Sequence, residues 1–115
     1  MESKRINIPL YPGGLVVFLG DLKEVEGKYD LRSTFGCNAL CFPREQEEKF
    51  TVHLCFSSLP SMGTLAHECF HATSFILGRL GVHPDHDNDE AQAYLLDWVV
   101  DTVYGELRKL EKYVD

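Results

Sequence analysis

The sequence has few positive charges and no long apolar run. Its 115 residues include 11 Lys and Arg against 18 Asp and Glu, which gives a net charge of −7. A surface that grips DNA or RNA regardless of sequence must be basic, and so must one that docks on anionic lipid. The longest apolar run, Leu15 to Leu19, is far too short to span a bilayer. We therefore expect no nucleic-acid partner and no membrane association.

The first residues also lack the features of an export signal. Met1 to Arg5 lead into alternating apolar residues and two prolines, where a signal peptide has a continuous apolar stretch. Four cysteines could form two disulfides in a secreted protein. Without an export signal, we expect reduced thiols in a cytoplasmic protein. These cysteines are Cys37, Cys41, Cys55 and Cys69.

No internal repeat, low-complexity tract or linker divides the chain, and its length fits a single domain over residues 1–115. Period-two patterns predict strands, with a polar hairpin loop before the last of them and a loop or one helical turn over 21–30. Helical spacing then predicts two helices. We expect an α+β fold with a small, mostly antiparallel sheet packed on two main helices. The expected strands are 5–11, 15–20, 34–42 and 50–56, the hairpin loop is 43–49, and the helices run from Ser58 or Ser61 to Gly81 and over 89–112.

Positive charge is missing altogether between Arg79 and Arg108. This stretch contains seven acidic residues and no Lys or Arg, so it matches the net charge of the whole chain. Such a local excess of carboxylates is costly unless water or a cation offsets it. The acidic residues are Asp85, Asp87, Asp89, Glu90, Asp97, Asp101 and Glu106.

The most informative segment is His67-Glu68-Cys69-Phe70-His71, an H-E-x-x-H motif within the first expected helix. Residues four apart lie on one face of a helix, so both imidazoles can bind one metal ion. Glu68 lies beside the same site and can take a proton from a water that the metal activates. Zinc suits this set because it accepts imidazole and carboxylate ligands and keeps one position open for catalysis.

A third ligand is available at the start of the second expected helix. Glu90 follows His71 with 18 residues between them, and a short connector can fold this helix back across the first. We therefore predict a zinc site of His67, His71 and Glu90. Asp89, His83 and His86 remain alternatives to Glu90. Tyr94 is a candidate donor to an oxyanion, but a tyrosine at the core edge with its hydroxyl in water explains it at least as well. Asp97 or Asp101 could orient a ligating histidine, although a solvated helix face is the favoured interpretation.

This pattern resembles the gluzincin metallopeptidases of the thermolysin and aminopeptidase type, and more closely the small ImmA/IrrE-like peptidase domains. The resemblance covers about residues 50–100. It rests on Thr64-Leu65-Ala66-His67-Glu68 and on Glu90-Ala91-Gln92-Ala93-Tyr94. It implies a minimal zincin core with His67, His71 and Glu90 as zinc ligands and Glu68 as general base. Cys69 departs from the pattern because these families usually have an apolar residue there.

The expected function is zinc-dependent hydrolysis of a peptide bond in a protein or peptide substrate. An edge strand, 35–42 or 50–56, could hold the substrate in extended form. A domain this small should have an open cleft, so we expect a second copy or a regulatory protein partner to help hold the target.

The alternative is a non-catalytic zinc-binding regulatory or interaction protein, of a kind that phages and mobile elements encode, in which the metal braces two helices. A DNA-linked protease of the Spartan type fits the acidic charge poorly. A second zinc cluster of Cys37, Cys41, His53 and Cys55 is disfavoured because strand residues four apart are about 13 Å apart.

Overall fold

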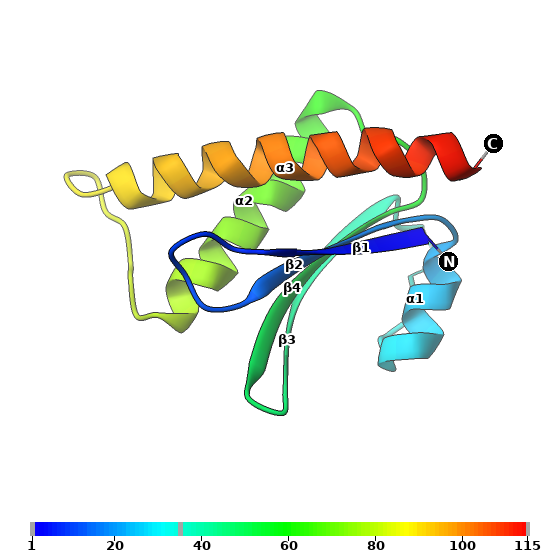
Figure 1. The fold of residues 1–115 in the computed structure, drawn as a ribbon, viewed down its shortest axis with the longest axis horizontal. Helices are drawn as coiled ribbons and strands as arrows, with labels where there is room; N and C mark the ends of the chain where they lie inside the picture. The colour runs from blue at the N-terminus through cyan, green and yellow to red at the C-terminus, as the bar shows by residue number, and fades with distance from the viewer. Residues whose placement is uncertain (1, 35, 115) are drawn as a thin grey trace.

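The computed structural model describes residues 2–34 and 36–114, and it has an α+β fold (Figure 1). A sheet of four strands has the order β1-β2-β4-β3, and three helices accompany it. The elements are β1 (Glu2–Asn7), β2 (Gly14–Leu19), α1 (Leu22–Tyr29), β3 (Ala39–Gln46), β4 (Lys49–Phe56), α2 (Met62–Arg79) and α3 (Glu90–Val114).

Two of the three strand pairings in the sheet are antiparallel. β1 pairs with β2, and β3 pairs with β4, in antiparallel register, whereas β2 and β4 run parallel. This confirms the expected α+β class with a small, mostly antiparallel sheet on two main helices. β3 is an edge strand of this sheet, and β4 lies in its interior.

Both long helices cover the same face of the sheet. Along β4 the residues Val52, Leu54 and Phe56 alternate with outward-facing ones and join the main core. α2 and α3 bury an apolar stripe against them, and α3 crosses over α2 (Figure 1). Within the described ranges, no helix combines the length and apolar character needed to cross a membrane.

The segment expected to be a loop or one helical turn is instead the eight-residue helix α1. Asp21 caps it by accepting a hydrogen bond from the Lys23 backbone N–H, and Asp30 ends it in a left-handed conformation with φ of 53°. Leu22 and Val25 pack on the opposite face of the sheet from α2 and α3. Two apolar residues three apart are too short a pattern to predict a helix from sequence.

The hairpin loop is also shorter than expected. β3 continues through Pro43 to Gln46, and only Glu47 and Glu48 form the turn, with φ of 53° and 65°. Two left-handed residues are what a tight hairpin turn requires, and Gly, Asn or Asp usually supply them. The polar character of residues 43–49 predicted a loop, although residues 43–46 belong to β3 and Lys49 belongs to β4. The expected strand 5–11 lies instead over Glu2–Asn7. The expected strand 34–42 begins only at Ala39, and Phe35 lies outside the described residues.

The core predicts a clear contrast between two leucines. Leu54 is fully buried, whereas Leu10 is fully exposed. Leu54→Ala should lower the free energy of unfolding by about 2–5 kcal/mol, because it removes buried methyl groups and leaves a cavity. Leu10→Ala should change it by less than about 0.5 kcal/mol. Urea unfolding of both variants measures this, and equal losses would contradict the assignment of the core.

Candidate functional site

The H-E-x-x-H motif lies in the first half of α2, which begins as the sequence predicted. Ser61 caps the helix, and its side chain accepts a hydrogen bond from the Thr64 backbone N–H. The buried face of α2 includes Leu65, Cys69 and Ala72. His67 and His71 lie on the other side of the helix and are exposed.

The two imidazoles converge. The Nε2 atoms of His67 and His71 are 3.1 Å apart, with ring centroids 4.7 Å apart and planes at 82°. Two such nitrogens approach this closely only when they share a proton or direct both lone pairs at one cation. Zinc–nitrogen bonds of about 2.0–2.1 Å would give an N–Zn–N angle of about 100°, near the tetrahedral value of about 109°. The imidazole pair therefore fits a zinc ion.

Glu68 differs from the histidines because it is buried. It retains 7% of its exposure, and its Oε1 lies 3.8 Å from His67 Nε2. Its Oε2 is buried and has no hydrogen-bond partner. A buried charged oxygen without a partner is destabilising, and proteins tolerate such groups mainly at functional sites. The carboxylate is thus held at the edge of the histidine pair at a cost to the fold.

Three cysteines lie close enough to Glu68 for its charge to raise their pKa. Burial, followed by the charge of Glu68, raises the pKa of Cys55 and of Cys69 to about 12, and both effects also raise the pKa of Cys41. Cys41 packs toward α2 and α3, whereas Cys55 packs toward α1, on opposite faces of the sheet. Cys37 is exposed and precedes β3. The arrangement gives protonated thiols on two sides of the sheet.

Glu90 is separate from the histidine pair in this structure. It is exposed at the first residue of α3, and among residues 2–34 and 36–114 no three His, Cys, Asp or Glu side chains gather as a metal site. Figure 1 shows that α3 crosses α2 at a point well after the first turn of α3, where Glu90 lies. The histidines lie in the first half of α2. Asp89, His83 and His86 are likewise exposed, in the connector before α3.

The other candidates on α3 also face solvent. Tyr94 is 72% exposed and lines an apolar hollow of about 380 Å³ that the β1–β2 loop shares. Asp97 and Asp101 are exposed. The structure therefore brings His67 and His71 together with Glu68 beside them. It does not bring Tyr94, Asp97 or Asp101 into a described contact with them.

The free edge of the sheet runs beside α2. Asn38, which precedes β3, and Thr64 in the first turn of α2 line a common pocket of about 300 Å³. At the other end of α2, Arg79 pairs with Glu45 of β3. α2 therefore follows β3 from one end to the other, so the face with Thr64, His67 and Glu68 lies along the edge strand.

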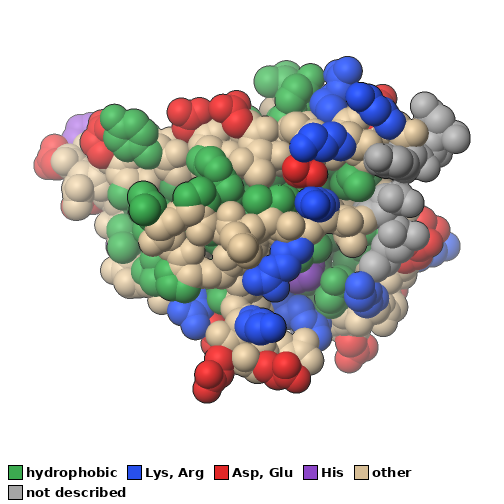
Figure 2. Space-filling model, in the orientation of Figure 1, with side chains coloured by type: hydrophobic (Ala, Val, Ile, Leu, Met, Phe, Trp, Pro, Cys, Tyr) green, Lys and Arg blue, Asp and Glu red, His purple; other side chains and the backbone are tan. Residues whose placement is uncertain are grey.

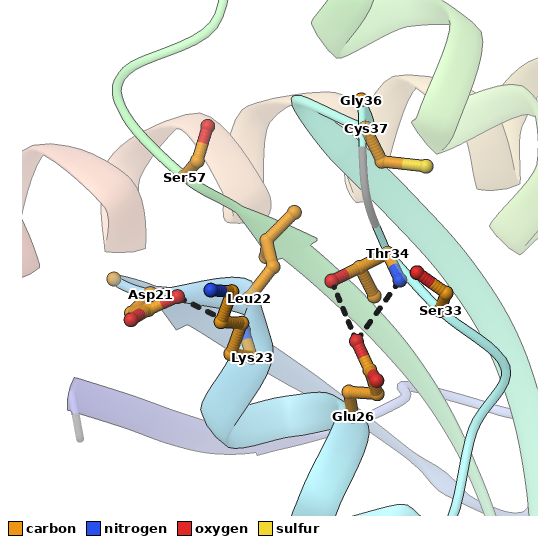
Figure 3. A pocket seen from close by; sticks show the side chains of 10 residues that line it. Asp21, Leu22, Lys23, Glu26, Ser33, Thr34, Gly36, Cys37 and Ser57 are labelled. Atoms are coloured by element: carbon orange, nitrogen blue, oxygen red, sulfur yellow. Dashed lines mark hydrogen bonds between the residues drawn. The ribbon is translucent and has the colours of Figure 1, made fainter.

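A hollow of about 630 Å³ lies elsewhere, between α1 and the segment before β3 (Figure 3). Polar side chains of this hollow form hydrogen bonds that stabilise the local backbone. Glu26 accepts hydrogen bonds of 3.0 Å from both the backbone N–H and the hydroxyl of Thr34, and Asp21 caps α1. It contains none of the predicted site residues.

The sequence analysis did not predict the burial of Glu68 or its thiol neighbours. One local pattern pointed to burial, because Glu68 has Leu65 three residues before it and Ala72 four residues after it. Its neighbour Cys41 could not be identified, because the pairing of α2 with β3 is a tertiary contact.

Comparisons of the chain with protein-family models, with curated proteins and with solved structures give no match.

The thiols predict selective labelling. At pH 8 a thiol with a pKa of about 12 is ionised in about one molecule in ten thousand, and only the thiolate reacts quickly. Iodoacetamide should therefore label Cys37 rapidly in the folded protein and all four cysteines in denaturant. Mass spectrometry counts the labels, and Cys37→Ser should abolish the rapid phase. A second rapid label on the native protein would contradict the raised pKa of the other three thiols.

Proposed function

We propose that this protein is a zinc-dependent metallopeptidase built on the H-E-x-x-H motif. Its assignment to the gluzincin type depends on Glu90, which is separate from the histidine pair in this structure. The observation that carries the proposal is the carboxylate of Glu68, whose buried Oε2 has no hydrogen-bond partner, beside two imidazole nitrogens 3.1 Å apart. The packing of α2 alone does not call for a charged group there, because an apolar residue would bury at lower cost. A role as proton acceptor beside two metal-binding histidines explains why the carboxylate of Glu68 is kept there.

Each residue of the motif has a distinct part in the proposed reaction. His67 and His71 hold the ion, which when bound supplies a Lewis acid and lowers the pKa of a water. Glu68 accepts the proton of the attacking water and then delivers it to the leaving amine nitrogen. Exclusion of water from its Oε2 strengthens the interaction of Glu68 with positive charge at the histidine pair.

The edge strand β3 supports a protein or peptide substrate. β4 is paired on both sides, so of the two strands expected to bind an extended peptide only β3 has a free edge. A segment added along this edge would follow α2 past its histidine face. Pro43 lies within β3, and proline in a sheet is typical of an edge strand.

The exposure of the histidines supports an open site. The side chain of His67 is 67% exposed, so the proposed metal ligands lie at the surface. We therefore include in the proposal a target held partly by a second copy or a regulatory protein, and a cytoplasmic location in line with the free thiols. The same exposure disfavours a metal that braces α2 against α3, because the buried face of α2 makes that contact.

Glu68→Gln tests the chemistry. This variant should keep zinc bound and lose more than about 100-fold in cleavage rate, because only the proton acceptor is removed. His71→Ala should lose zinc. Elemental analysis after purification without added metal, and cleavage of an unfolded protein such as casein, measure the two effects. Glu111→Gln is the matched control and should change neither. Cleavage retained by Glu68→Gln would exclude the proposed general base.

Glu90→Ala tests the third ligand separately. If Glu90 joins the histidines when zinc binds, this variant should weaken zinc affinity by more than about tenfold, with Glu111→Ala as its control. Competition with a chromophoric chelator gives the affinity. Unchanged affinity would remove Glu90 from the ligand set, while the role of Glu68 would still be decided by the previous experiment.

A further inference from the structure

The sheet face opposite α2 and α3 has a pocket of about 360 Å³ that α1 leaves open. Strand register brings its residues together from distant parts of the chain. One row across the sheet pairs Arg5 with Val16, Val16 with His53 and His53 with Phe42. The next row pairs Gly14 with Thr51 and Thr51 with Arg44. Side chains in these two rows share a face, because alternate residues of a strand point the same way.

Positive charge is concentrated in this pocket although the protein as a whole is acidic. Arg5, Arg44 and Lys49 line it, and Figure 2 shows Lys and Arg side chains gathered around a histidine on this view of the molecule. Within the described part of the chain, none of these three cations forms an ion pair. Like charges facing one pocket repel one another, and a bound anion would relieve that repulsion.

Contacts within the protein hold the Arg44 guanidinium in place. The Arg44 guanidinium lies 4.9 Å from the centre of the Tyr29 ring and donates a hydrogen bond to Gln46 Oε1 at 2.9 Å. Arg5 lies across Gly14, where an added Cβ would be 3.2 Å from its Nε. Orientation before binding lowers the entropy that a ligand must overcome.

His53 adds a buried polar group. It retains 3% of its exposure, its ring stacks on Phe42, and its Nε2 lies 3.0 Å from the Thr51 hydroxyl. Its Nδ1 is buried with no hydrogen-bond partner. Burial, followed by the charges of Arg44 and Lys28, lowers the pKa of His53 to about 4. The ring is therefore neutral at pH 7, and it forms part of the lining of the pocket.

We propose that this pocket binds a phosphate monoester, held by Arg5, Arg44 and Lys49 with His53 and Thr51 beneath it. A guanidinium presents parallel N–H donors that match phosphate oxygens, and a charge close to −2 suits several cations better than a single carboxylate does. This site lies on the other face of the sheet from the histidine pair, and it does not depend on the proposed peptidase function.

A small ligand fits better than a nucleic acid strand. The pocket volume is at the lower end of the range for small-molecule sites. Glu47, on the β3–β4 turn, also lines the pocket, so three cations face one carboxylate there. This net positive charge suits one dianion better than a polyanion that continues past Glu47. The net charge of −7 opposes a long polyanion further.

An NMR titration of the full chain with inorganic phosphate at pH 7.5 tests the site. Amide shifts should concentrate at residues 5, 14, 44, 51 and 53 and saturate, whereas sodium chloride at equal ionic strength should not reproduce them. Arg44→Gln and Arg5→Gln should each weaken binding by about tenfold or more. Arg108→Gln removes the same charge from the exposed end of α3 and should leave the affinity unchanged.

Further titrations distinguish a nucleotide ligand from recognition of the phosphate group alone. Adenosine monophosphate binding more tightly than phosphate would identify a nucleotide, and equal affinity would identify recognition of the phosphate group alone. Equal weakening by Arg108→Gln and Arg44→Gln, or binding of single-stranded RNA without binding of either small probe, would overturn the proposal. Circular dichroism and thermal unfolding without phosphate check that each variant is folded.

Discussion

The packing of one face of α2 against β3 and β4 is the constraint on which the candidate metal site depends. The apolar stripe of Leu65, Cys69 and Ala72 fixes the rotation of the helix, because any other rotation would expose it. That rotation places Glu68 at the boundary of the core and leaves His67 and His71 outside. The burial of apolar surface thus stabilises the fold and at the same time supplies the free energy that keeps a charged group partly out of water.

The same sheet serves two different surfaces. Its inner face is closed by α2 and α3, whereas its outer face is covered only in part, by α1. Period-two alternation along β4 sends Leu54 inward and His53 outward, so neighbouring residues of one strand belong to the core and to the proposed anion pocket. A change at one surface need not disturb the other, because the interior strand between them is fixed by pairing on both sides.

Local sequence patterns predicted the elements that have strong periodicity. Ser61 and the apolar spacing of α2, and the alternation of β4, are confirmed. α1 was missed because Leu22 and Val25 give too short a pattern. The extension of β3 was missed because two glutamates, which rarely adopt positive φ, form its turn. Strand pairing with β4 supplies the stabilisation that outweighs this local cost.

The sequence by itself determined the α+β class, the amphipathic helices and the placing of two histidines on one turn of α2, because each follows from spacing along the chain. Only the tertiary structure decided that Glu68 is buried, that β3 is an open edge, and that Arg5, Arg44 and His53 share one pocket. These features depend on contacts between residues far apart in sequence, and the free energy of such contacts is set by packing, which no local pattern encodes.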